Sequence, residues 1–113
     1  MPAMNVRFEY LYRDAGNFKR WGEIVFSNAN NIDADSLTAI AEEALRMDRL
    51  YFVASEVDVP DLHFADHIEV LDHGWHEIHA FHFTDDAPND AQTRDFETFA
   101  ESLLRASHGL HRV

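Results

Sequence analysis

Residues 4–13 alternate between apolar and polar side chains, and no other feature of the sequence constrains the fold as much. This alternation predicts a β-strand with one apolar face. Asp14 to Asn17 are turn residues, and residues 18–27 are predicted to return as a second strand of a hairpin. A four-residue loop would place Tyr12 opposite Lys19 and Tyr10 opposite Trp21. The apolar face would consist of Met4, Val6, Phe8, Tyr10 and Tyr12, with Glu23 opposite Phe8 and Val25 opposite Val6.

Two later segments have the apolar spacing of a helix with one buried side. The first begins after Asp33, a residue suited to cap a helix, and its stripe is Leu37, Ile40, Ala41, Ala44 and Leu45. The second follows Asp90 or Thr93 as cap and ends before Gly109. Its stripe is Phe96, Phe99, Ala100, Leu103 and Leu104.

Between the helices, the chain is rich in β-branched and aromatic residues. Residues 50–59 and 75–84 are predicted strands, and a short strand is plausible around Ile68 and Val70. The order of elements is therefore ββαβ(β)βα. We expect residues 1–113 to form a single α+β domain, with a mostly antiparallel sheet of four or five strands and two helices packed on one face.

The chain is strongly acidic, with a formal net charge of −12 over 113 residues. This charge repels nucleic acid and anionic membrane surfaces, so neither is an expected partner. Cysteine is absent, which excludes disulfides and thiolate metal sites. No signal peptide or apolar stretch long enough to cross a membrane is evident, and we expect a cytoplasmic protein.

Four histidines recur at intervals of three residues in the segment 73–82, at positions 73, 76, 79 and 82. A strand has a period of two, which would put Glu77 and His79 on the same face as Phe81 and Phe83, and His76 on the other. Only Glu77 and His79 would then share a side. They are candidates for an acid and base pair or, with His76, for a weak divalent metal site. A polar patch on a half-buried strand is the alternative interpretation.

The predicted hairpin offers further polar groups to this pair. Lys19 and Glu23 would lie among the aromatic side chains of the hairpin, either as an ion pair or as part of a pocket. If that face packs toward residues 75–83, the groups converge. The candidate ligand-binding residues are Tyr12, Lys19, Trp21, Glu23, Trp75, Glu77 and His79.

Three short motifs suggest a relationship to known sequences. They are YRDxxNxK at residues 12–19, GEIxFSN at residues 22–28 and WHE at residues 75–77. This pattern resembles a family of small uncharacterised bacterial proteins. The resemblance implies a shared fold over most of the chain but no activity.

Two classes of function fit these residues. The sequence favours a non-enzymatic binding or interaction module, which uses an aromatic sheet surface to contact a protein partner, a small molecule or a second copy of the chain. The alternative is a hydrolytic enzyme that uses Glu77 and His79, assisted by Glu23 and by a divalent metal ion as the one cofactor left open. No nucleophile elbow or phosphate-binding glycine loop is present.

Overall fold

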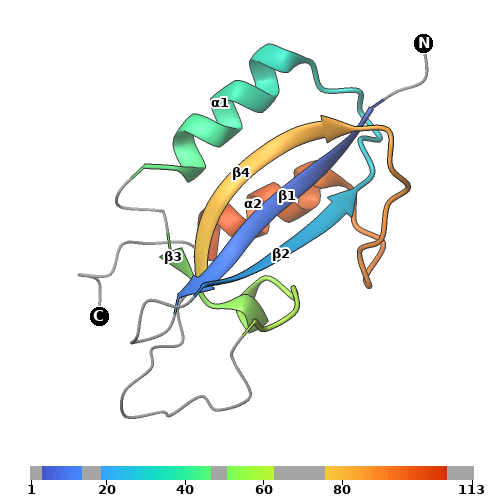
Figure 1. Ribbon diagram of the computed structural model, residues 1–113. Coiled ribbons are helices and arrows are strands. Elements are labelled where there is room, and N and C mark those ends of the chain that lie inside the picture. The colour runs from blue at the N-terminus through green and yellow to red at the C-terminus, as the bar shows by residue number, and fades with distance from the viewer. Residues whose placement is uncertain (1–3, 14–18, 47–50, 63–75, 107–113) are drawn as a thin grey trace.

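The computed structural model describes residues 4–13, 19–46, 51–62 and 76–106. Within these residues, four strands form one antiparallel sheet in the order β2-β1-β4-β3 (Figure 1). The strands are β1 (Asn5–Arg13), β2 (Lys19–Phe26), β3 (Tyr51–Phe52) and β4 (His76–Thr84). The helices are α1 (Ala34–Ala44) and α2 (Phe96–Ala106), with a short 3-10 helix, η1 (Ala54–Glu56), after β3.

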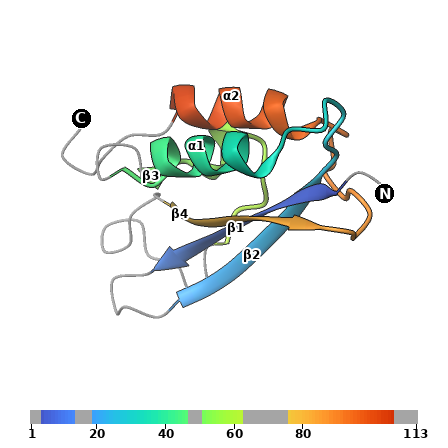
Figure 2. The ribbon, with the colours of Figure 1, turned by 90° about the horizontal axis from the view of Figure 1, so that it is seen from above.

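Both α-helices cover the same face of the sheet, as Figure 2 shows from above. The core lies between this face and the helices. It contains Val6, Phe8, Tyr10 and Tyr12 of β1, Ile24 and Phe26 of β2, Ile78 and Phe81 of β4, Leu37 and Ala44 of α1, and Phe96, Phe99, Ala100 and Leu103 of α2. The predicted α+β class, with four or five antiparallel strands and two helices on one face, is confirmed.

The helix starts follow from local hydrogen bonds. Asp33 caps α1 as predicted, because its Oδ1 accepts a hydrogen bond from the Ser36 backbone at 2.9 Å. The α2 cap differs from both predicted candidates: Asp95 Oδ1 accepts from the Thr98 backbone at 2.9 Å. Hydrogen bonds from the backbone and side chain of Ser36 lower the pKa of Asp33, and hydrogen bonds from the side chain and backbone of Thr98 lower the pKa of Asp95. The stripe of α1 is one residue shorter than predicted, since Leu45 lies beyond the helix and is exposed.

The strand predicted over residues 50–59 is largely wrong. Only Tyr51 and Phe52 pair with β4, after which the chain turns into η1. Val57 and Val59 are nevertheless buried in the core, so their β-branched side chains pack without joining the sheet. The predicted short strand at Ile68 and Val70 and the helix stop at Gly109 lie outside the described residues.

The hairpin register differs by one residue from the prediction. Tyr10 lies opposite Gly22 and Tyr12 opposite Arg20, so five residues rather than four separate the paired ends Arg13 and Lys19. A shift of one residue moves every side chain of a strand to the other face. The core therefore receives Ile24 and Phe26, and the side chains of Lys19, Trp21 and Glu23 lie on the face opposite the helices.

A second irregularity lies in β4. The pairing of β1 with β4 shifts between Glu9 and Tyr10, which leaves His79 as an extra residue. Before this bulge, His76 and Ile78 face the core; after it, Phe81 and Phe83 do so. The prediction that Phe81 and Phe83 share a face with Glu77 and His79 is wrong for this reason.

Candidate binding surface on the open sheet face

In the described part of the chain, no helix covers the face of the sheet that lies opposite α1 and α2 (Figure 2). We call this surface the open face. The strand registers and alternation define its residues. They are Arg7, Glu9, Leu11 and Arg13 of β1, Lys19, Trp21, Glu23 and Val25 of β2, and Glu77, His79, Ala80 and His82 of β4.

An aromatic pair forms the centre of the open face. Trp21 and His79 meet edge to face, with ring centroids 4.8 Å apart and an interplanar angle of 77°. They come from strands on either side of β1, in which Leu11 lies opposite Trp21 of β2 and Glu77 of β4. Leu11 is only 4% exposed, whereas Trp21 is 54% exposed. The indole is thus positioned by its neighbours but still presents most of one side to solvent.

Ion pairs frame this centre at both ends. Toward one end, Arg13 Nε lies 3.1 Å from Glu77 Oε2. Toward the other, Arg7 Nε lies 3.0 Å from Glu9 Oε2 and 3.9 Å from Glu23 Oε2. His82 Nε2 lies 3.6 Å from Glu9 Oε1. Each of the three carboxylates of the open face therefore already has an arginine close by.

A hollow of about 300 Å³ opens beside Trp21. Of the described residues, Glu9, Trp21, Gly22 and Glu23 line it. This volume is at the lower limit of typical small-molecule sites, which measure roughly 300–1,000 Å³. The hollow carries two carboxylates near Arg7, so a small ligand here would meet a polar rim and one aromatic wall.

The structure brings together five of the seven predicted ligand-binding residues. Lys19, Trp21, Glu23, Glu77 and His79 all lie on the open face, though only Trp21 and Glu23 line the hollow. Their shared face results from two shifts that the sequence did not reveal, the hairpin register and the bulge at His79. Tyr12 lies instead in the core and is fully buried. Trp75 lies outside the described residues.

The weak metal candidates do not form a site. His76 faces the core, while Glu77 and His79 lie on the open face. Among the described residues, no three histidine or carboxylate side chains come close enough to hold one ion.

His76 has a structural role in the core that its spacing in the sequence does not indicate. It is 1% exposed and contacts the rings of Tyr10, Tyr12 and Phe52. Its Nε2 accepts a hydrogen bond from the Leu62 backbone at 3.0 Å. Nearby, the Tyr10 hydroxyl donates to the Pro60 carbonyl at 2.8 Å. Burial, with a smaller contribution from Asp61, raises the pKa of this hydroxyl. Together the two bonds attach residues 60–62 to the sheet.

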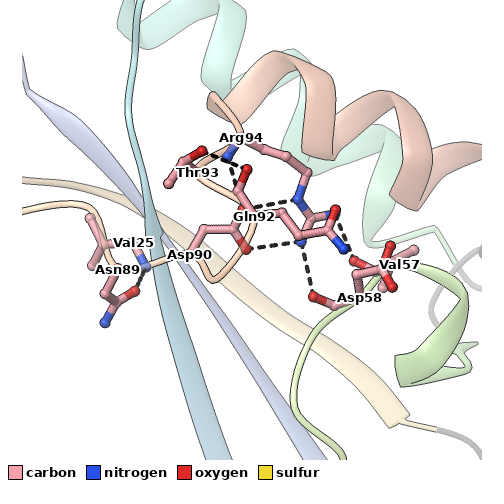
Figure 3. Close-up of polar contacts among 8 residues, drawn as sticks. All are labelled: Val25, Val57, Asp58, Asn89, Asp90, Gln92, Thr93 and Arg94. Atoms are coloured by element: carbon pink, nitrogen blue, oxygen red, sulfur yellow. Dashed lines mark hydrogen bonds and ion pairs between the residues drawn. The ribbon is translucent and has the colours of Figure 1, made fainter.

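A second polar cluster, missed by the sequence analysis, centres on Arg94 (Figure 3). Arg94 Nε and one of its terminal nitrogens each donate to an oxygen of the Asp90 carboxylate at 2.9 Å. The guanidinium also donates to the carbonyls of Val57 at 2.7 Å and Asp58 at 3.0 Å. Its carbon lies over the rings of Phe26 and Phe99, 5.6 and 5.3 Å from their centroids. This cluster joins the loop after η1 to the start of α2 and has a structural role.

Comparison with models of known protein families, with curated protein sequences and with solved structures gives no match. Within the described residues, neither α-helix combines the length and apolar character that crossing a membrane requires.

Proposed function

We propose that this protein is a binding module and that its open face contacts a partner protein, with Trp21 as the anchor. The observation that carries the proposal is the exposure of Trp21, 54% of whose surface is accessible on the open face. Tryptophan is enriched among the few residues that dominate the binding energy of protein interfaces. The contact with His79 limits the orientations of the indole, which reduces the entropy lost on binding.

The charge distribution supports the same surface. On the open face, Arg7, Arg13 and Lys19 balance Glu9, Glu23 and Glu77, so its formal net charge is zero. The entire charge of −12 therefore belongs to the rest of the chain. The centres of protein interfaces are depleted in charged residues and enriched in aromatic ones, and their rims are polar. A neutral face with an apolar centre on a strongly acidic protein fits that description.

Other candidates have less support. The charge of −12 opposes binding to nucleic acid. A hydrolytic role would need Glu77 or Glu23 as a base, yet both carboxylates lie within 4 Å of an arginine. A small cationic ligand in the hollow of about 300 Å³ is the second candidate, because Glu9 and Glu23 line it.

The proposal is tested by comparing two exposed apolar side chains. The wild-type protein, Trp21→Ala and Leu45→Ala are each immobilised and exposed to a lysate of the source cells, and retained proteins are quantified by mass spectrometry. Leu45 is the matched control, since it is 39% exposed but follows α1, away from the open face. We expect at least one partner whose recovery falls roughly thirtyfold with Trp21→Ala, as loss of about 2 kcal/mol predicts, and is unchanged with Leu45→Ala.

Binding at the open face is then measured directly. In a Trp75→Phe chain, Trp21 is the sole tryptophan, because the sequence contains two. Addition of the purified partner should shift the emission of Trp21 to shorter wavelength as the indole loses water. Equal recovery with all three immobilised proteins, or an unchanged emission spectrum, would contradict the proposal. An emission change caused only by the low-molecular-mass fraction of the lysate would favour the small ligand.

A further inference from the structure

Strand β2 lies at an edge of the sheet, because the strand order is β2-β1-β4-β3. In an antiparallel pair, every second residue of an edge strand directs its N–H and C=O away from its neighbour. Val25 is one such residue, since its N–H donates to Asn89 Oδ1 at 2.8 Å and its C=O accepts from the Asn89 backbone at 2.9 Å. By alternation, the N–H and C=O groups of Lys19, Trp21 and Glu23 point outward too.

The outward N–H and C=O groups of β2 differ in whether a described residue forms hydrogen bonds to them. Asn89 covers the edge at Val25, as Figure 3 shows. No described residue forms a hydrogen bond to the outward backbone groups of Lys19, Trp21 or Glu23. Within the described residues, the segment 19–23 is therefore a short edge without backbone partners, and Asn89 marks its end.

The side chains of this segment are complementary to a second copy of themselves. Lys19 and Glu23 flank Trp21 at equal distances along the strand, and all three lie on the open face. In an antiparallel pair of two identical segments centred on Trp21, Lys19 of each copy lies opposite Glu23 of the other. Opposite charges at directly paired positions stabilise a sheet, and aromatic pairs do so as well.

We propose that two copies of this protein pair through β2, antiparallel and in this register, to form one continuous eight-stranded sheet. The two-fold axis passes through the Trp21 pair. Trp21 exchanges two backbone hydrogen bonds with Trp21 of the second copy, and each Lys19 exchanges two with Glu23 of the other chain. The register agrees with the backbone, because the residues brought opposite each other are those whose N–H and C=O groups point outward. A two-fold contact of this kind is closed, so association stops at a dimer.

This inference goes beyond the proposed function and does not rest on it. Pairing uses the edge of β2, whereas the proposed partner protein contacts the open face. The dimer would double the width of the open face and place the two Trp21 side chains where the two sheets join. The pure protein is sufficient to test the dimer, so its failure leaves the capture experiment unaffected, and the reverse also holds.

Charge reversal at the two flanking positions tests the register. Sedimentation equilibrium of the wild-type protein should give the mass of two chains. Lys19→Glu and Glu23→Lys should each weaken dimerisation roughly tenfold or more, since both cross-strand pairs become like-charged. The double variant Lys19→Glu, Glu23→Lys restores opposite charges at both pairs and should restore the dimer. Glu42→Lys is the control for net charge, because it makes the same charge change as Glu23→Lys on the exposed side of α1.

Hydrogen exchange of the backbone amides locates the contact. The amides of Trp21 and Glu23 should be protected at concentrations where the dimer forms and should exchange freely on dilution, while that of Leu37 in the core is protected at both. Three results would each overturn the proposal: a wild-type protein that stays monomeric at millimolar concentration, a double variant no better than the single ones, or a dimer in which the Trp21 amide exchanges freely. Circular dichroism verifies that every variant is folded.

Discussion

The residues Asp90 and Arg94 form the most deeply buried of the described ion pairs, with side-chain exposures of 1% and 11%. The carboxylate accepts from the guanidinium and also from the Arg94 backbone N–H at 2.9 Å. A buried charge is tolerated only when its partner and hydrogen bonds replace the lost water. Here, the carbonyls of Val57 and Asp58 complete the coordination of the guanidinium.

We therefore expect Asp90→Asn to lower the free energy of unfolding by at least about 3 kcal/mol, because Arg94 would keep its charge in a buried site without a counterion. Urea denaturation measures this change. Asp58→Asn is the matched control: it removes the same charge, but the exposed Asp58 side chain contributes nothing to the cluster and only its carbonyl does. The control should change the stability by less than about 0.5 kcal/mol.

The same pair predicts a dependence on pH. Hydrogen bonds from Arg94 lower the pKa of Asp90. A lowered pKa in the folded state means that the stabilisation is complete above the pKa of the unfolded chain, about 3.9, and is lost as the pH falls through the folded value. The difference in stability between the wild-type protein and Asp90→Asn should thus be constant from pH 7 to 5 and shrink below about pH 4. A difference that persists at pH 2 would contradict this account.

At the level of single residues, the sequence predicted which side chains carry chemistry better than where they act. Local patterns predict Asp90 only as a helix cap, because no such pattern indicates its buried pair with Arg94 or the bonds from Arg94 to the carbonyls of residues 57 and 58. His76 belonged to a regular histidine series, yet it is a buried acceptor for the Leu62 backbone. Both roles depend on contacts between distant parts of the chain.

Among the elements, strand β2 best shows what a pattern leaves undecided. Apolar side chains occur at both alternating sets of its positions, Trp21 and Val25 in one and Ile24 and Phe26 in the other. The predicted register places the first set on the core face of the sheet, together with the charged side chains of Lys19 and Glu23. The observed register avoids the desolvation of these two charges and fills the core with Ile24 and Phe26. The cost of burying the charges of Lys19 and Glu23 is therefore the criterion that distinguishes the two registers.

Gly22 of β2 lies where the observed register leaves little space for a side chain. It lies opposite Tyr10, and a Cβ atom at Gly22 would lie 3.0 Å from Tyr10 Cζ and 3.0 Å from Leu62 Cδ1. We expect Gly22→Ala to destabilise the fold by about 1–3 kcal/mol through overpacking. Leu62→Ala makes room for the new methyl group, so the cost of Gly22→Ala should be smaller in that background by about 0.5 kcal/mol or more. A double-mutant cycle in urea measures the coupling, and strictly additive effects would show that Leu62 does not limit the space.

For the whole molecule, the sequence predicted the fold class because each long element has its own periodic pattern. The alternation in residues 4–13 and the stripes of α1 and α2 act locally and do not depend on register. The open face could not be predicted in the same way, since it results from the hairpin register and from the bulge at His79. A bulge adds one residue without an obvious change in composition. The sequence therefore does not indicate that, beyond His79, the other alternating set of β4 residues faces the core.

The total charge makes a prediction about association at this scale. The proposed dimer joins two chains of charge −12, whose mutual repulsion acts over the whole molecule, while the Lys19 and Glu23 pairs act at short range. The Debye length falls from about 30 Å at 0.01 M salt to about 8 Å at 0.15 M, so salt screens the long-range repulsion more than the short contacts. The dissociation constant from sedimentation should therefore decrease between these two concentrations. In Glu42→Lys, whose net charge is smaller in magnitude, this decrease should be weaker. A dissociation constant that rises with salt would mean that the two short-range pairs, and not the total charge, control association.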